Sequence, residues 1–216
     1  MEPIGICRTC FDEKFVIPRQ SGLAPSTKGM LELYPPFNKE EALKGLEKFS
    51  HIFIFWMPHK ASESNKLTVR PPRLGGNKRI GVFATRSPFR PNPICHSVVE
   101  LEKIENGRVY FKNHDILDQT PVFDLKPYIP EWDIFSNANS GWIEDKTTKI
   151  NVHFELDSAI DEEIKVMLTE LLCLSPQPSY QIEEIRDYAF KVNNHEIKVS
   201  YDPKKGFIVR KIHCLL

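Results

Sequence analysis

Two β-like segments joined by Asn106-Gly107 restrict the fold of this chain more than any other part of its sequence. Residues 96–104 alternate between apolar and polar side chains, and residues 108–114 resume a β-like pattern after the dipeptide. Asparagine and glycine both tolerate the positive φ angles that two-residue hairpin turns require. We therefore predict an antiparallel hairpin over this region.

Three further segments in the first half have β character. Residues 4–8 and 80–84 are short and partly apolar, whereas residues 51–57 are aromatic or β-branched on both faces. The last of these predicts a central buried strand. Pro58 ends it, since proline supplies no hydrogen-bond donor to a ladder.

One helix is predicted among these strands. Asn38 followed by Glu41 is a capping-box pattern, and the inner face of the helix would carry Ala42, Leu43, Leu46 and Phe49. Short strands joined by irregular loops are typical of a closed or nearly closed barrel rather than of a doubly wound sheet. We predict a mainly β fold with an N-terminal antiparallel or mixed β-barrel.

A second, smaller unit is expected at the C-terminal end. Residues 131–149 read as a polar linker, and residues 151–156 as a last strand of the barrel, so we predict domains at 1–156 and 157–216. Ser158 and Asp161 begin a helix, whose apolar stripe is Ile164, Met167, Leu168, Leu171 and Leu172. Pro176 and Pro178 interrupt the chain, and turns at 193–194 and 202–206 then separate three strands.

The composition sets the broad class. Lys and Arg number 29 and Asp and Glu number 29, which excludes an acidic tail protein and a globally basic coat protein. No apolar run is long enough to cross a bilayer, and the first residues lack the features of a signal peptide. Five cysteines in such a chain are expected to be reduced thiols. We predict a soluble cytoplasmic protein in which the C-terminal unit packs on the barrel.

Positive charge is concentrated in residues 59–92, where Glu63 is the only acid. The basic residues of this segment are Lys60, Lys66, Arg70, Arg73, Lys78, Arg79, Arg86 and Arg90. Such a face attracts phosphates through counterion release, although a solvated loop is the alternative. Prolines 88, 91 and 93 stiffen the part that carries Arg86 and Arg90, which suits either an anion clamp or a salt-bridged loop.

Other patterns carry weaker signals. Cys7-x-x-Cys10 lacks the second ligand pair that a zinc site needs, and Cys95-His96 would point to opposite faces of a strand. Asp115 and Asp118 could bind ribose hydroxyls or form Asx turns. Dinucleotide and Walker A fingerprints are absent from the sequence.

Ordered motifs along residues 4–133 resemble the TsaA-like (TrmO) family. They are Ile4-Gly5-Ile6 with Arg8; Pro18-Arg19-Gln20-x-Gly22-Leu23; Gly45-Leu46-x-x-Phe49-Ser50-His51; Val69 to Asn77; Val82-Phe83-Ala84-Thr85-Arg86-Ser87-x-x-Arg90-Pro91-Asn92; Asp115-x-x-Asp118-x-Thr120-Pro121; and Asp124-x-Lys126-Pro127-Tyr128. Pro176-x-Pro178-x-Tyr180 looks like the family's C-terminal domain.

The resemblance implies a homodimeric β-barrel methyltransferase. It would use S-adenosylmethionine, without a metal, to methylate the exocyclic nitrogen of threonylcarbamoyladenosine at tRNA position 37, beside the anticodon. The cofactor sites would lie near the subunit interface, and the carried-over contacts are Pro18, Arg19, Gln20, His59, Lys60, Arg86, His96, Asp115, Ile116, Leu117 and Asp118.

The basic segment would then bind the anticodon stem-loop. Its predicted tRNA contacts are Arg70, Arg73, Lys78, Arg79 and Arg90. Lys204, Lys205, Arg210 and Lys211 either extend this surface or belong to a solvated hairpin. The sequence does not select a general base. A non-catalytic RNA-binding barrel and a small-molecule methyltransferase remain the alternative functions.

Overall fold

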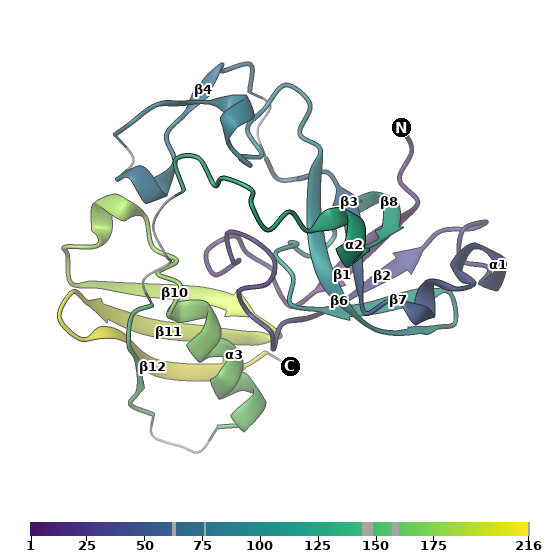
Figure 1. Ribbon diagram of the computed structural model, residues 1–216. Helices are drawn as coiled ribbons and strands as arrows, with labels where there is room; N and C mark the ends of the chain where they lie inside the picture. Colours follow the sequence, from purple (N-terminus) through teal and green to yellow (C-terminus); the bar gives the residue numbers. More distant parts are fainter. Residues whose placement is uncertain (62–63, 76, 144–148, 157–159, 216) are drawn as a thin grey trace.

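The computed structural model describes residues 1–61, 64–75, 77–143, 149–156 and 160–215. Its first unit is a closed barrel with the strand order β1-β2-β7-β6-β3-β8 (Figure 1). All six neighbour pairs run antiparallel. The strands are β1 (Gly5–Thr9), β2 (Lys28–Leu33), β3 (His51–Trp56), β6 (Cys95–Glu105), β7 (Arg108–Lys112) and β8 (Pro121–Pro127). The predicted barrel is therefore confirmed.

The predicted hairpin is present as β6 and β7. Asn106 and Gly107 both have positive φ, at 52° and 70°. A side chain at Gly107 would also place its Cβ 2.4 Å from the Asn38 backbone oxygen. Glycine is thus needed here for its φ angle and for the close approach of the 38–39 backbone.

Alternating side chains of the strands fill the barrel. Ile52 and Ile54 of β3 are fully buried, whereas Phe53 and Phe55 between them are only partly buried. The prediction that β3 is buried on both faces was therefore wrong, because its second face lies on the outside of the barrel. The interior also contains Cys7, Leu31, Leu33, Leu43, Val99, Val109, Phe111, Ile116 and Val122.

Two predicted elements are shorter than expected. The helix α1 covers only Glu40–Leu43, its N-cap is Lys39 without a side-chain hydrogen bond, and Gly45 at φ 92° ends it. A 3-10 turn, Leu46–Lys48, follows. Likewise, the strand expected at 80–84 is the two-residue β5 (Ile80–Gly81), followed by a 3-10 turn at Val82–Ala84.

The second unit is a four-stranded sheet with the order β10-β11-β12-β9 and one helix, α3 (Glu162–Leu172). Its strands are β9 (Val152–Phe154), β10 (Arg186–Val192), β11 (His195–Asp202) and β12 (Gly206–Cys214). β9 pairs in parallel with β12, so its predicted place in the barrel was wrong. The residue pattern indicates a strand here but does not indicate which strand it pairs with. The Asp161 carboxylate caps α3 by accepting a hydrogen bond from the Glu163 N–H (2.7 Å); Ser158 lies outside the described residues.

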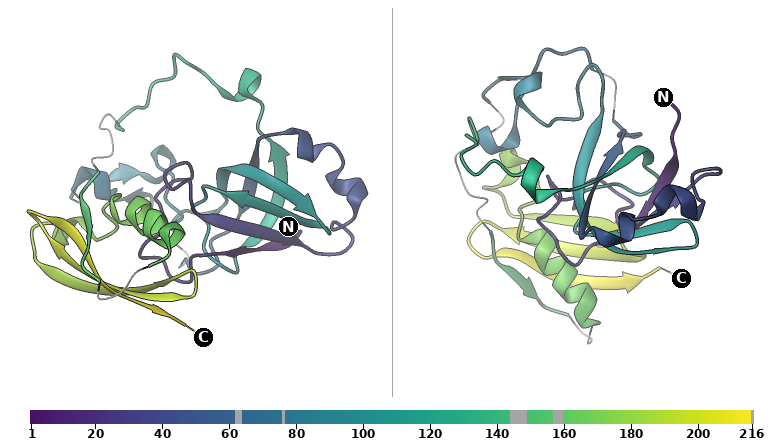
Figure 2. Two further views of the ribbon diagram at one scale, coloured as in Figure 1. Left: turned by 90° about the horizontal axis from the view of Figure 1, so that it is seen from below. Right: turned by 45° about the vertical axis from the view of Figure 1, so that its right-hand side comes forward.

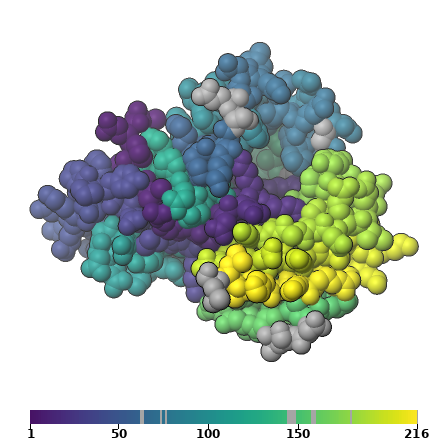
Figure 3. All heavy atoms as spheres, turned by 180° about the vertical axis from the view of Figure 1, so that it is seen from behind, coloured from purple at the N-terminus to yellow at the C-terminus, as the bar shows by residue number. Residues whose placement is uncertain are grey.

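The two units share a hydrophobic core. Phe11 and Leu117 from the barrel side are buried in the same cluster as Leu168 and Leu171 of α3 and Phe207 of β12. Figure 3 shows the C-terminal residues packed directly against the rest of the molecule. The prediction that the C-terminal unit packs on the barrel is confirmed, as is the apolar stripe of α3.

Several short elements lie outside the barrel and the four-stranded sheet. They are β4 (Thr68–Val69), which pairs with β5, the 3-10 turns Pro72–Leu74 and Ser179–Gln181, and the one-turn helix α2 (Pro130–Asp133). After α2 the chain runs as an extended segment towards the β4 region (Figures 1 and 2). None of the described helices is long and apolar enough to cross a membrane.

Replacing Gly206 with Ala should destabilise the second unit. Gly206 has φ 92°, and an added Cβ would lie 2.1 Å from the Asn151 backbone oxygen, which accepts a hydrogen bond from Phe207 N–H at 3.0 Å. The substitution therefore both strains the backbone and displaces β9 from β12. We expect a loss of about 3 kcal/mol in the free energy of unfolding, measured by urea titration.

Gly45 provides the matched control because it has the same φ, 92°, with nothing within 4 Å of an added Cβ. Gly45→Ala should cost only about 1 kcal/mol, the backbone contribution. Equal losses in the two variants would contradict the proposed clash.

Candidate cofactor and nucleic-acid site

A large cleft lies between the basic segment and the extended chain after α2. Its volume is about 1410 Å³. The positively charged residues along its described walls are Arg19, Lys66, Arg70, Arg79 and Arg86. Asp and Glu are absent from those walls. Pro71, Pro72, Phe89 and Trp142 supply apolar surface, so the cleft combines flat contact area with an excess of positive charge.

Three of the predicted cofactor residues meet at one end of this cleft. The Arg86 Nη1 donates a hydrogen bond to Gln20 Oε1, and Gln20 Nε2 donates to the Arg19 carbonyl oxygen (2.8 Å). Arg19 Nη2 in turn donates to the carbonyl oxygen of Ser175 (3.4 Å) in the C-terminal unit. The loop that carries Arg19 and Gln20 thus contacts both the proline-stiffened loop and the second unit.

Asp115 lies within electrostatic reach of Arg86. Burial raises the pKa of its carboxyl to about 6, and the largest opposing effect is a hydrogen bond from Ser97, with the Arg86 charge also lowering it. Ser97 Oγ donates to Asp115 Oδ1 at 2.5 Å, and Trp56 Nε1 donates to Ser97 Oγ at 2.9 Å. This chain of two hydrogen bonds holds one carboxylate oxygen in place.

His96 lies on the outer face of the barrel. Its ring is 6.1 Å from that of Phe53 and 6.2 Å from that of Phe55, between centroids. Partial burial, and secondarily Arg86, lowers the pKa of His96. Cys95 precedes it on β6, and burial raises the pKa of the Cys95 thiol to about 11, so Cys95 is not a thiolate nucleophile at neutral pH.

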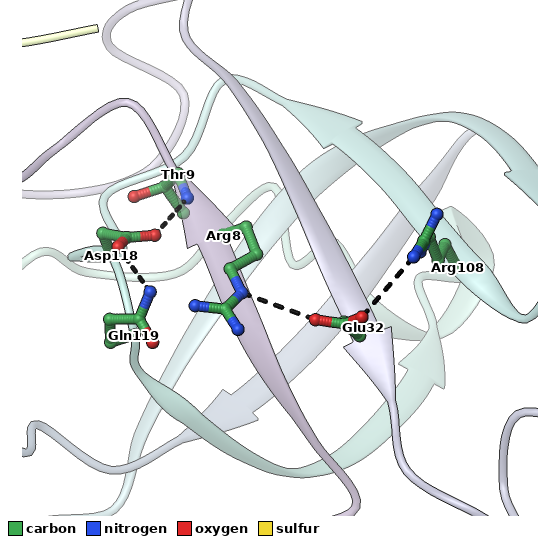
Figure 4. Close-up of polar contacts among 6 residues, drawn as sticks. All are labelled: Arg8, Thr9, Glu32, Arg108, Asp118 and Gln119. Carbon is green, nitrogen blue, oxygen red and sulfur yellow. Dashed lines mark hydrogen bonds and ion pairs between the residues drawn. The ribbon is translucent and has the colours of Figure 1, made fainter. Parts of the chain in front are cut away.

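Two more predicted cofactor residues, Asp118 and His59, lie near the end of β1. Asp118 Oδ1 accepts a hydrogen bond from Thr9 N–H (2.9 Å), and Asp118 Oδ2 accepts from Gln119 Nε2 (2.8 Å) (Figure 4). His59 Nδ1 is 3.3 Å from Thr120 Oγ1. Burial, followed by the Lys60 charge, lowers the pKa of His59. These residues therefore tie the 115–120 turn to its surroundings within one chain.

Other predicted cofactor positions are occupied by packed side chains. Pro18, Ile116 and Leu117 are buried, and Ile116 belongs to the barrel interior. Lys60 Nζ donates to the Asp12 carbonyl oxygen (3.4 Å). The structure thus brings Arg19, Gln20 and Arg86 together in the cleft, with Asp115 and His96 within electrostatic reach of Arg86. It does not place His59, Lys60 or Asp118 on the described walls.

Of the predicted tRNA contacts, Arg70 and Arg79 line the cleft. Arg90 Nη1 donates to the Thr85 carbonyl oxygen (3.1 Å) and lies over the Phe83 ring at 5.9 Å from its centroid. Lys78 is exposed, and the Arg73 side chain lies outside the described part of the structure. The ion pairs between described residues all lie outside 59–92, so the salt-bridged-loop interpretation does not apply to the described basic side chains of this segment.

Several site residues were not identified from the sequence. Ser97 and Trp56 are ordinary strand residues there, and nothing local connects them to Asp115. Trp142 Nε1 donates to the Ala84 carbonyl oxygen (2.8 Å), which joins a predicted linker to the arginine loop. At the C-terminal end, Arg210 pairs with Glu155, so this residue belongs to an ion pair rather than to a free basic surface.

Burial also affects the thiols of Cys7 and Cys10. Burial raises the pKa of the Cys7 thiol well above its ordinary value and that of Cys10 to about 12. Within the described residues, no group of three or more His, Cys, Asp and Glu side chains is placed to hold a metal ion.

The structure thus combines a closed barrel with a cleft whose described charged residues are all basic, an arrangement that attracts anionic ligands. Comparison with known proteins then assigns the family. Residues 6–134 match the model of the tRNA-methyltransferase O N-terminal domain. The chain therefore belongs to the TrmO family.

Relatives that align over most of their length extend this match. The chain is 38% identical to the tRNA (adenine(37)-N6)-methyltransferase of Escherichia coli, over 93% of this chain and 91% of that protein. It is 43% identical to a putative S-adenosylmethionine-dependent methyltransferase of Pseudomonas aeruginosa, over 85% and 84% of the two chains. A crystal structure of TrmO from P. aeruginosa superposes with a TM-score of 0.81 at 35% identity, covering 99% of this chain and 95% of that one.

His114, the neighbour of Asp115, should remain neutral well below its ordinary pKa. Complete burial lowers the pKa of its imidazole to about 4. Its Nδ1 accepts from Ile116 N–H (3.2 Å), which leaves Nε2 as the donor to the Lys28 carbonyl oxygen (3.1 Å). Protonation of the imidazole would place a proton on Nδ1, where it would face the N–H of Ile116. An NMR titration should therefore show no protonation of His114 between pH 8 and about 5.

The same shift links stability to pH. Because the unfolded chain binds a proton on His114 near pH 6.5 and the folded chain only near pH 4, this stabilisation is complete above pH 6.5 and declines on acidification towards pH 4. Asp115 acts in the opposite sense over nearly the same window, since its pKa is raised in the folded state. A His114 resonance that titrates with an ordinary midpoint would contradict the assigned hydrogen bonds.

Proposed function

We propose that this protein is an S-adenosylmethionine-dependent tRNA methyltransferase that acts on adenosine 37, beside the anticodon. Its substrate nucleoside is threonylcarbamoyladenosine, and the methyl group goes to the exocyclic nitrogen. The observation that carries the proposal is the cleft in which Arg19, Gln20 and Arg86 adjoin a wall whose described charged residues are all basic. Family membership supports the reaction class.

The residues of the cleft suit the cofactor. When bound, S-adenosylmethionine supplies an electrophilic methyl group on a positively charged sulfur. A guanidinium such as that of Arg86 can bind its carboxylate, Gln20 offers an amide, and Phe89 and Trp142 offer flat apolar surface for an adenine ring. His59, Lys60 and Asp118 remain predicted cofactor contacts, which a second copy of the chain would have to bring to the same ligand.

Catalysis in this proposal depends mainly on positioning and on one proton acceptor. Transfer to an exocyclic nitrogen requires that nitrogen to lose a proton, and Asp115, with a pKa of about 6, is largely ionised at neutral pH and can accept it. The hydrogen bonds from Ser97 and, behind it, Trp56 orient this carboxylate. Lys78, Arg73 and Arg90 would bind phosphates of the stem-loop, which makes binding depend on salt.

We also propose that the protein is a homodimer. Trp132, Ile134 and Phe135 follow one another on α2 and the chain after it, with 67%, 58% and 71% of their surfaces exposed. This segment leads directly into the wall of the cleft at Asn139 and Trp142. A partner subunit that covers these apolar side chains would therefore also act on the site.

Arg86→Ala should abolish most of the activity while leaving the fold intact. Arg86 is exposed and lies outside both hydrophobic cores, so its removal takes a charge from the cleft without leaving a cavity. We expect methyl transfer to threonylcarbamoylated tRNA to fall about 100-fold or more, with an unchanged melting temperature. Arg108→Ala, which removes an arginine paired with Glu32 at 3.5 Å on the barrel surface, is the matched control.

Three results would contradict the proposal. Unchanged turnover of Arg86→Ala would contradict the site. Salt-sensitive tRNA binding with no heat on titration with millimolar S-adenosylmethionine would favour a non-catalytic RNA-binding barrel. Methyl transfer to a small acceptor without tRNA would favour a small-molecule methyltransferase.

The rate should depend on the ionisation of Asp115. Since the carboxylate is the acceptor, kcat/KM should fall as the pH drops below about 6. The Ser97 hydrogen bond lowers the pKa of Asp115, so Ser97→Ala should raise that pKa and move the acidic limb to higher pH. Ser50→Ala, which removes a hydroxyl 2.9 Å from His51 Nδ1, should leave the limb in place. An unmoved limb in Ser97→Ala would show that another group titrates.

A further inference from the structure

Within the cleft, the register of the smallest sheet brings two arginines together. β4 and β5 pair antiparallel with Thr68 opposite Gly81 and Val69 opposite Ile80. The next positions in this register are Arg70 and Arg79. Arg70 is two residues from Thr68 and therefore shares its face of the ladder. The hydrogen bond from Arg79 Nη1 to Thr68 Oγ1 (3.3 Å) places Arg79 on that face as well.

This arrangement is unfavourable for the protein alone. Like charges at opposed positions of an antiparallel pair repel each other, and neither arginine forms an ion pair with a described residue. Both line the cleft together with Lys66 and Arg86. An anion between the two guanidinium groups would remove the repulsion and satisfy donors that now face solvent.

The cofactor leaves this positive charge uncompensated. S-adenosylmethionine carries one carboxylate, which the Arg86 end of the cleft can bind, and its sulfonium and ammonium groups add positive charge. The other substrate can supply a second anion. Threonylcarbamoyladenosine has one on the modified base itself, the threonine carboxylate, about the reach of a side chain from the nitrogen that is methylated.

We propose that Arg70 and Arg79 form the subsite that binds the carboxylate of the threonylcarbamoyl group, and so select the modified base over plain adenosine. This inference rests on the proposed function. A backbone phosphate is the other oxyanion that a tRNA could present. The base carboxylate fits better because the two arginines share one cleft with Arg86 and Gln20, whereas Lys78 is not among the described residues of the cleft walls.

The test compares two synthetic anticodon stem-loops that differ only at the threonine terminus of the modified base. One carries the free carboxylate and the other its primary amide, which keeps the size and removes the charge. Affinity is measured by fluorescence anisotropy without cofactor, and methyl transfer by single-turnover assay with it. The native protein should bind the carboxylate stem-loop about tenfold or more tightly than the amide.

Arg70→Gln and Arg79→Gln should reduce this ratio towards one by weakening only the carboxylate complex. Lys78→Gln should weaken both complexes equally and lower the salt dependence, as expected of a phosphate contact. Lys44→Gln, on the exposed end of α1, controls for loss of a distant charge. Melting temperatures of the two arginine variants should be unchanged or raised, because a repulsion is relieved.

Two outcomes would overturn the subsite. If the native protein binds both stem-loops equally, the carboxylate is not recognised. If Arg70→Gln and Arg79→Gln weaken both stem-loops by the same factor, these arginines contact phosphates instead. Failure of the proposed function has a different signature, since neither stem-loop would then be methylated by the native protein and S-adenosylmethionine, whatever the binding ratio.

Discussion

Closure of the barrel through β1 is the constraint on which the site depends. β1 pairs fully with β2, but its ladder with β8 joins only Gly5 to Val122 and Ile6 to Pro121. Beyond Ile6, the turn that precedes β8 hydrogen-bonds to β1 and so extends the seam between these two strands. Cys7 N–H donates to the Thr120 carbonyl oxygen, and the Cys7 carbonyl oxygen accepts from Gln119 N–H, both at 2.9 Å.

The same seam positions the carboxylates of residues 115–118. Thr9 Oγ1 donates to the Ile116 carbonyl oxygen (2.9 Å), and Thr9 N–H donates to Asp118 Oδ1. The Asp118 carboxylate therefore takes part in closing the barrel, whereas the Asp115 carboxylate accepts a hydrogen bond from Ser97 on β6. One turn thus uses one carboxylate to close the barrel and holds the other against Ser97 within electrostatic reach of Arg86.

How much of this could be predicted from the sequence depended on the range of the interactions. The β6–β7 hairpin was predictable because Asn106 and Gly107 encode their own φ angles. The length of α1 was not predictable, since Gly45 ends the helix and the capping pattern at Asn38 indicates only where a helix begins. The partner of β9 was equally hidden, because the parallel pairing with β12 joins segments more than fifty residues apart.

The residues of the candidate site also differ in whether the sequence alone could identify them. Arg86 and the basic segment could be found from composition and motif, because charge density is a local property of the sequence. The Trp56–Ser97–Asp115 hydrogen bonds could not, since they connect three strands or turns through side chains that are ordinary in their own segments. The resemblance named Asp115 as a contact, but only the fold showed that its carboxyl is buried and that its pKa is raised.

The distribution of ion pairs over the surface relates the fold to the proposed function. The barrel and the second unit pair several of their described cations with acids, as Arg8 and Arg108 do with Glu32 (Figure 4), while the described basic side chains of residues 59–92 have no such partners. Surface pairs of this kind contribute little to stability, so leaving the described cations of residues 59–92 without acidic partners costs the fold little. Pairing those cations internally would instead neutralise the field that attracts an anionic substrate. The opposed arginines at the end of β4 and β5 are the local extreme of this arrangement, because a bound anion would relieve their repulsion.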